Sequence, residues 1–317
     1  MYIITPSFPS LFYAIHKFYL KEDVTLITSS LSVHKIACEL EINCIYLNIY
    51  SGIIGKIKSK FTLNKLLKKL NLDQNIFLFD NIHCFEGFYL LSKWTLGNTY
   101  YTNLSFKHDE YIKRLTIKQL IKKRLVNLFF QLDLCYKNQN ENPFLGINDV
   151  FLKKNRINNY IVNNFNSIKL DVINKAKINI PQFNSILILQ GTLKGIIEPS
   201  SISKVFKELE LIKSLVIKEH PTHITKSKNI SKIPNYYPVE LCFNSISTNI
   251  ISIYSSSLII ASQLQNKNSI SLLDLVQWMN ESYKDSIKKL LITESNNKIH
   301  FPKSFPELRN LLKHSQI

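Results

Sequence analysis

The stretch Ser214-Leu215-Val216-Ile217-Lys218-Glu219-His220-Pro221 decides the fold class of this chain. Its apolar run predicts a buried strand, which ends at the proline because proline has no N–H to continue a ladder. His220 therefore stands at the carboxyl end of a strand. In open α/β sheets ligands bind in the crevice outside those ends, where an imidazole can reach a phosphate or a hydroxyl. A His-Pro pair taken alone is more often a plain strand stop, so the surrounding sequence must decide between the two interpretations.

Strand-like and helix-like runs alternate on both sides of this stretch, which predicts βαβ units and parallel sheets. Before it we expect strands at 2–5, 24–28, 44–47 and 75–80, with helices at 10–20, 34–41 and up to 70. The alternation restarts near residue 185 with a strand at 185–190, a helix from 202 capped by Ser200–Ser201, and a strand at 249–254. The sequence thus predicts two Rossmann-like domains, 1–180 with a helical insert and 181–317 with a C-terminal helix, 305–314, that crosses back over the domains.

The net charge of +17 comes from 40 Lys and Arg against 23 Asp and Glu. Two amphipathic basic segments, Lys56–Lys69 and Lys113–Arg124, carry much of it. The commoner interpretation is a helix that packs its apolar stripe on a core and exposes its lysines to water. The alternative is peripheral contact with an anionic membrane surface. No nucleic-acid-binding module, Cys/His metal spacing or interleaved aromatic platform accompanies the charge, so nucleic acid is a poor explanation.

The five cysteines, Cys38, Cys44, Cys84, Cys135 and Cys242, are odd in number and scattered, which suits reduced thiols. The N-terminus lacks the pattern of a signal peptide, and no apolar run reaches the length that spans a bilayer. We therefore expect a cytoplasmic protein, soluble or peripheral on the inner face of the inner membrane. Whether it forms a homodimer stays open.

Three further groups of polar residues follow predicted strands of the second half. The turn Gln190-Gly191-Thr192 comes after the strand at 185–190, and Gly191 lets a backbone approach a ligand. Glu240 lies near a predicted helix start. Ser255, Ser256 and Ser257 open a helix after the strand at 249–254 and offer hydroxyl and N–H groups to an anion. Serine clusters are usually turn or cap residues, and it is their nearness to His220 in the chain order that predicts a phosphate site.

The paired α/β domains with ligand groups at strand ends describe a GT-B glycosyltransferase, and short motifs point to one family. The chain resembles the bacterial sialyltransferases, above all the lipooligosaccharide sialyltransferases of glycosyltransferase family 52, with the polysialic-acid capsule transferases as more distant relatives. The resemblance rests on motifs in family order, namely 4–11, Gln190–Leu193, Lys218–Pro221, Pro238–Glu240 and Tyr254–Leu258. It includes the His-Pro and Ser-Ser motifs that those families share in the donor domain.

The chain departs from the family at the acidic motif, a pair of acids followed by glycine after a strand of the first domain. Asp80 follows its strand directly but lacks the second acid and the glycine. Glu86 keeps an acid before Gly87, with Phe85 in place of the first acid. Position favours Asp80 and local sequence favours Glu86, so both stay candidates for the catalytic base. An ordinary surface or capping acid is the bland alternative for each.

The resemblance implies transfer of sialic acid from CMP-sialic acid to a terminal galactose of a surface glycan, with inversion. It implies that Asp80 or Glu86 acts as general base and that His220, next to Pro221, stabilises the leaving phosphate. Ser255, Ser256 and Ser257 would hold the phosphate, and Gln190, Gly191, Thr192 and Glu240 would contact ribose or cytosine. No cofactor or metal is expected, because protein donors can neutralise a single phosphate. Another CMP-sugar such as CMP-Kdo, or a decayed binding protein, are the alternatives.

Overall fold

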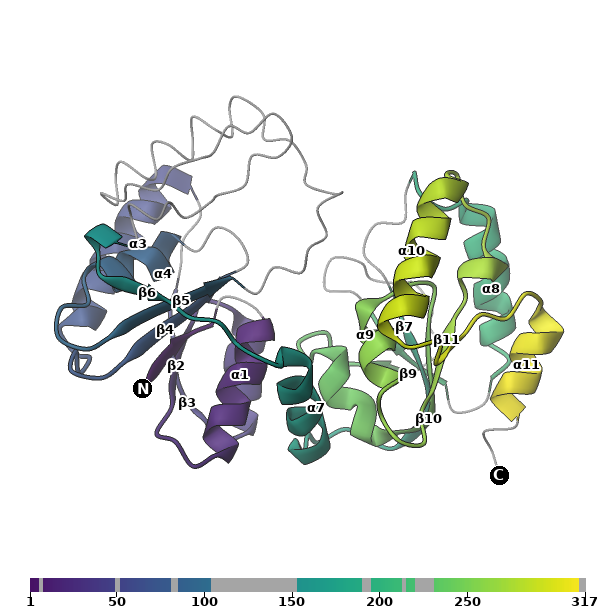
Figure 1. Ribbon diagram of the computed structural model, residues 1–317, viewed down its shortest axis with the longest axis horizontal. Helices are drawn as coiled ribbons and strands as arrows, with labels where there is room; N and C mark the ends of the chain where they lie inside the picture. The colour runs from purple at the N-terminus through teal and green to yellow at the C-terminus, as the bar shows by residue number, and fades with distance from the viewer. Residues whose placement is uncertain are drawn as a thin grey trace. The chain divides into compact units, whose positions relative to one another are not determined.

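The computed structural model describes residues 1–5, 8–48, 52–80, 85–103, 153–189, 195–212, 215–219 and 231–313. The chain divides into two compact units, Met1–Ile168 and Lys169–Ile317. Each unit contains a six-stranded parallel sheet accompanied by helices (Figure 1). The predicted fold class, α/β with two Rossmann-like domains as in GT-B glycosyltransferases, is confirmed by this topology.

The first sheet has the strand order β3-β2-β1-β4-β5-β6. Its strands are β1 Tyr2–Ile4, β2 Thr25–Thr28, β3 Asn43–Tyr46, β4 Ile76–Asp80, β5 Thr99–Asn103 and β6 Ile157–Asn159. The helices described before β5 are α1 Phe8–Tyr19, α2 Leu31–Glu39, α3 Gly52–Leu67 and α4 Phe85–Ser92.

The central strands of the first sheet alternate between two covered faces. Phe77 and Phe79 of β4 face α1, where the Tyr13 ring lies 6.4 Å and 4.5 Å from theirs. Ile76 and Leu78 face the other way and join a buried cluster with residues of α3 and α4. Because both faces are covered, consecutive strand residues are all apolar, which is why the sequence shows runs rather than alternation.

The second sheet repeats the same order as β12-β11-β10-β7-β8-β9. Its strands are β7 Phe183–Ile188, β8 Leu215–Lys218, β9 Ser231–Ile233, β10 Ile246–Ser252, β11 Asn268–Ser271 and β12 Ile299–His300. The accompanying helices are α7 Phe165–Lys175, α8 Pro199–Leu209, the 3₁₀ helix η1 Val239–Ser245, α9 Ser256–Ala261, the 3₁₀ helix η2 Leu273–Leu275, α10 Glu281–Glu294 and α11 Phe305–Lys313.

Two sets of helices also cover the second sheet. Leu187, Ile217 and Ile251 join one buried cluster with residues of α8 and of α11, among them Leu308 and Leu312. On β10 the neighbouring Ile250 is fully buried as well, and η1 and α9 both contact that strand. Apolar residues of the C-terminal helix α11 therefore pack against the core of the second unit.

The helix predicted from residue 202 begins earlier, and its predicted cap is wrong. The N-cap of α8 is Glu198, and Pro199 follows in the first turn, where its missing N–H costs nothing. Ser201 Oγ instead donates back to the Glu198 carbonyl at 2.8 Å. The unit boundary at Ile168/Lys169 falls inside α7, twelve residues before the boundary expected at residue 180.

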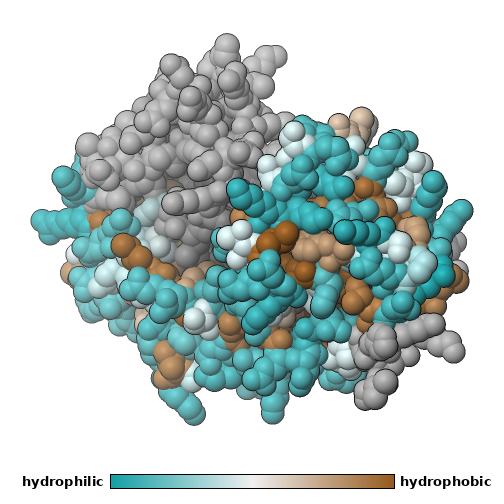
Figure 2. Space-filling model, turned by 45° about the vertical axis from the view of Figure 1, so that its right-hand side comes forward, coloured by the Kyte–Doolittle hydropathy of each residue, from teal (hydrophilic) through white to brown (hydrophobic). Residues whose placement is uncertain are grey.

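Hydrophilic residues cover most of the described surface in the view of Figure 2, with hydrophobic patches scattered among them. Within the described residues, no helix is both long and apolar enough to cross a membrane.

Two loops of the first unit approach so closely at Gly97 that a larger residue would not fit there. A Cβ at Gly97 would collide with the backbone carbonyl of Gln74, whose oxygen also accepts a hydrogen bond from Trp94 Nε1 at 2.9 Å. We expect Gly97→Ala to lower the free energy of unfolding by about 2 kcal/mol, measured by urea denaturation. Leu96→Ala, at the exposed neighbouring position, should change it by less than about 0.5 kcal/mol. Equal effects of the two substitutions would contradict this account.

Candidate functional site

The strand order creates a switch point in each sheet. Strands β1 and β4 of the first unit, and β7 and β10 of the second, are neighbours whose chains leave toward opposite sides. Ligands of open α/β sheets bind in the crevice that this divergence opens outside the carboxyl ends. In the second unit the strand ends at this switch point are Ile188 and Ser252, which pair in register.

Buried hydroxyl groups tie the strand ends together at these edges. Ser252 Oγ of β10 donates to the Ile188 carbonyl of β7 at 3.0 Å, directly across the switch point. Ser271 Oγ at the end of β11 donates to the Ile253 carbonyl at 2.7 Å. In the first sheet Thr28 Oγ1 donates to the Thr5 carbonyl at 2.6 Å. Each of these bonds links two segments at the carboxyl edge of a sheet.

The three predicted serines follow β10 and take different positions. Ser255 is the N-cap of α9, and its Oγ accepts a hydrogen bond from the Ser257 N–H at 3.2 Å. Ser257 is buried, whereas Ser256 is exposed. The sequence placed them as one group; the structure makes Ser255 and Ser257 parts of the framework and leaves the Ser256 side chain facing solvent.

Glu240 is brought to these serines by η1. Its Oε1 accepts a hydrogen bond from Ser257 Oγ at 2.9 Å, although the two residues lie on different elements. The 3₁₀ helix is anchored at its other end, where Asn244 Nδ2 donates to the Ile173 carbonyl of α7. Thus two predicted site residues from separate motifs, Glu240 and Ser257, are in direct contact.

Two buried lysines surround this acidic group. Burial lowers the pKa of Lys169 on α7, and the nearby Glu240 carboxylate partly offsets that effect. Burial likewise lowers the pKa of Lys218 at the end of β8, opposed by Cys242, Glu219 and Glu240. The Lys218 ammonium donates to the Glu219 carbonyl at 2.8 Å. Glu240 therefore lies near two buried lysines.

The strand predicted before His220 is present as β8, and all four of its residues are buried. The Glu219 carboxylate after it is buried and pairs with Lys232 Nζ at 2.7 Å. His220 and Pro221 themselves lie outside the described residues. The turn residues Gln190, Gly191 and Thr192, after β7, lie outside them too.

The two candidate bases of the first unit lie on different elements. Asp80 is the last residue of β4, next to β1 at the switch point. Glu86 lies in the first turn of α4, is 5% exposed and forms an ion pair with Lys56 of α3. The Glu86 carboxylate therefore links α4 to α3 through this ion pair.

Sequence reasoning missed Lys169, Lys218 and Lys56 as parts of these networks. For Lys169 a signal existed, because it shares a helical stripe with Val172, Ile173 and Ala176, where a fourth apolar residue would be expected. Lys218 carries a similar signal, as a lysine closing an apolar strand. Nothing local marks Lys56 among its neighbouring lysines.

Within the described part of the chain no group of three or more His, Cys, Asp or Glu side chains could hold a metal ion. The cysteines described there, Cys38, Cys44 and Cys242, are free thiols. Burial, helped by the neighbouring Cys38, raises the pKa of the Cys44 thiol to about 12.

No family model matches the chain, and no curated protein sequence is similar to it. Solved structures align over nearly its whole length. UDP-GlcNAc 2-epimerase from Methanocaldococcus jannaschii is 14% identical over 99% of both chains, with a TM-score of 0.45. S. aureus MnaA, solved with UDP, is 14% identical over 98% of this chain and 94% of that one, with a TM-score of 0.46. The glycosyltransferase of kitacinnamycin is 10% identical over 100% and 90%, with a TM-score of 0.43. Likenesses this weak carry no argument about the reaction.

The buried Lys169 gives a pH-dependent stability that can be measured. Its pKa is lowered on folding, so between that value and the ordinary lysine value of 10.5 the unfolded chain holds more protons. We therefore expect the free energy of unfolding of the wild type, minus that of Lys169→Met, to increase as the pH rises from about 7 to about 10. Urea denaturation at each pH measures the difference.

The matched control is Lys204→Met on α8, where the lysine is exposed. Its difference from the wild type should stay flat over the same pH range. A flat or falling difference for Lys169→Met would contradict the burial of a charged amine at this position.

Proposed function

We propose that the protein is an inverting glycosyltransferase that moves sialic acid from CMP-sialic acid to a terminal galactose of a bacterial surface glycan, lipooligosaccharide. The observation that carries the proposal is the convergence of two sequence motifs at one switch point. Ser255–Ser257 follow β10, Glu240 bonds to Ser257, and β10 pairs in register with β7, whose end precedes the Gln190 turn. The motif resemblance supplies the choice of donor.

On the donor side we assign the binding of a phosphate oxygen to the hydroxyl of Ser256, which is exposed. Ser255 and Ser257 hold that segment in shape through the cap and the Glu240 bond. Glu240 is half-buried and accepts hydrogen bonds, which suits contact with a ribose hydroxyl. We assign to His220, two residues after the end of β8, the hydrogen bond to the departing phosphate.

On the acceptor side we assign the role of general base to Asp80. A base must come within hydrogen-bond reach of the acceptor hydroxyl. The Glu86 carboxylate is buried and paired with Lys56, whereas Asp80 ends a strand at the switch point. In the reaction Asp80 takes the hydroxyl proton, the acceptor oxygen bonds to the anomeric carbon, and the bond from that carbon to the phosphate oxygen breaks. CMP leaves with the bonding electrons, and His220 stabilises their charge.

The donor chemistry is tested by CMP release from CMP-sialic acid in the presence of a galactose-terminated acceptor. We expect His220→Ala to lower kcat by about 10²–10⁴-fold, because the leaving group loses its stabilising partner. Ser256→Ala should lower kcat/KM by roughly 10-fold through loss of one hydrogen bond to a charged group. Ser286→Ala, which removes an exposed hydroxyl of α10, is the control and should leave turnover unchanged. Activity of His220→Ala at the wild-type level would refute the assigned role.

The two acids are separated by comparing Asp80→Asn with Glu86→Gln. Asp80→Asn should lower kcat by about 10²–10⁴-fold while the melting temperature stays near that of the wild type. Glu86→Gln should keep most of the activity per folded molecule but lower the melting temperature, because Lys56 loses its buried partner. The opposite pattern would make Glu86 the base.

The identity of the sugar donor is tested by comparing turnover of CMP-sialic acid with turnover of CMP-Kdo. Turnover of CMP-Kdo without turnover of CMP-sialic acid would show that CMP-Kdo is the donor, and the proposed roles of the residues would stay the same. Absence of turnover with either sugar, together with a melting temperature that CMP does not raise, would reject the proposal.

A further inference from the structure

An open groove lies between α3 and α4 of the first unit and takes no part in the proposed reaction. Its volume is about 480 Å³. Both helices follow strands, so they begin at the carboxyl edge of the sheet and run back toward the amino edge. The groove residues lie from the middle to the end of each helix, as Phe61 to Lys68 and Tyr89 to Lys93. The groove is therefore separate from the switch point.

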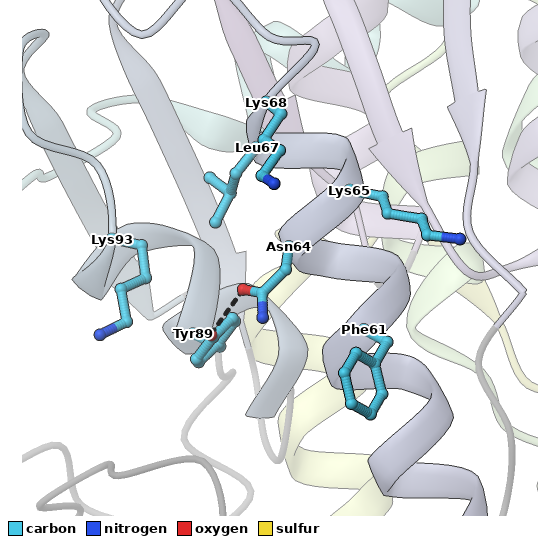
Figure 3. A pocket seen from close by; sticks show the side chains of 7 residues that line it. All are labelled: Phe61, Asn64, Lys65, Leu67, Lys68, Tyr89 and Lys93. Carbon is cyan, nitrogen blue, oxygen red and sulfur yellow. Dashed lines mark hydrogen bonds between the residues drawn. The ribbon is translucent and has the colours of Figure 1, made fainter.

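The floor of the groove is a fixed aromatic ring. Tyr89 is buried, and its hydroxyl donates to Asn64 Oδ1 at 2.7 Å (Figure 3). Lys60 Nζ and Lys93 Nζ each lie 5.8 Å from the centre of the Tyr89 ring. Two lysine ammonium groups, from α3 and from the end of α4, therefore lie near the same ring.

The rim combines cations with an exposed apolar ring. Lys65, Lys68 and Lys93 line the groove and are exposed, and Phe61 beside them is 64% exposed. Figure 3 shows Lys65 and Lys93 extending away from the groove on opposite sides. Exposure of a phenylalanine ring to water is unfavourable in free energy. Its position among lysines therefore fits a partner that offers both anionic groups and apolar surface.

The sequence around the groove carries one sign of charge. From residue 52 to residue 72 there are six lysines and no Asp or Glu. Lys56 pairs with Glu86, whereas Lys65 and Lys68, farther along the chain, line the groove. A phospholipid surface fits this chemistry, because anionic headgroups meet the lysines while an aromatic ring enters the boundary with the acyl chains.

We propose that this groove and its rim, with Phe61, Lys65, Lys68 and Lys93 as contact residues, bind the surface of an anionic phospholipid bilayer. Nucleic acid fits less well. The Tyr89 ring is buried and cannot stack on a base, and Asn64, the amide in the groove, is bonded to Tyr89. The inference does not depend on the identity of the sugar donor.

The test is sedimentation of the full chain with vesicles. Wild-type protein should bind vesicles of phosphatidylglycerol mixed with phosphatidylcholine, and should not bind vesicles of phosphatidylcholine alone. The triple variant Lys65→Ser, Lys68→Ser, Lys93→Ser should lower the partition coefficient on the order of 100-fold. Phe61→Ser should lower it by about 10-fold, and Phe61→Leu should restore most of the binding.

A matched triple variant of the second unit controls for charge. Lys204→Ser, Lys289→Ser, Lys298→Ser removes the same charge from exposed positions and should keep vesicle binding within about 3-fold of the wild type. Equal losses in the two triple variants would show that net charge, and not this groove, drives the binding. That result, or absence of binding to anionic vesicles, would overturn the proposal.

A labelled single-stranded RNA provides the rival partner. If the groove lysines mattered for RNA binding and not for vesicle binding, the surface would be a nucleic-acid site and the proposal would be wrong. Thermal melts of every variant confirm that the exposed substitutions leave the fold intact.

Discussion

Burial of the central strands on both faces is the constraint from which the rest of the structure follows. Such strands accept apolar residues at nearly every position, as in β8, where even Lys218 is covered. Polar chemistry is thereby moved to the carboxyl ends of the strands, where the chain turns. In the second unit Ser252 is the polar residue at the end of β10, and its buried hydroxyl donates to the Ile188 carbonyl at the end of β7. The residues that follow such ends, and not those within strands, are available for ligands.

The second unit keeps an unusual amount of charge near this edge. Lys169 and Lys218 are buried, and for both the cost of desolvation outweighs the attraction of nearby acids, so the pKa of each amine is lowered. Glu240 is the acid that these two cations share. Its bond to Ser257 links η1 to α9, and Asn244 links η1 to α7. The network therefore holds three elements around one carboxylate, an arrangement suited to presenting that group in a fixed orientation.

The strands and helices were predictable where the signal is local. The apolar runs at β4, β7 and β8 are contiguous, so composition alone marks them. The start of α8 was misplaced because serine is a frequent cap, whereas Pro199 sets the true first turn. The sequence marked the three serines as one candidate phosphate site, but it did not predict their division into framework and exposed members. That division depends on which hydroxyl meets Glu240, and sequence spacing does not contain this information.

By itself the sequence determined the fold class and the order of the polar motifs, because hydrophobic runs and turn residues act within a few positions of the chain. Only the tertiary structure decided which strand ends are neighbours. Pairing of β10 with β7 joins residues more than sixty positions apart, and pairing of Lys56 with Glu86 joins two helices. Such contacts arise from the packing of whole elements, in which many weak apolar contacts jointly select one strand order. The physical reason is that long-range pairing depends on the sum of these contacts and not on any local pattern.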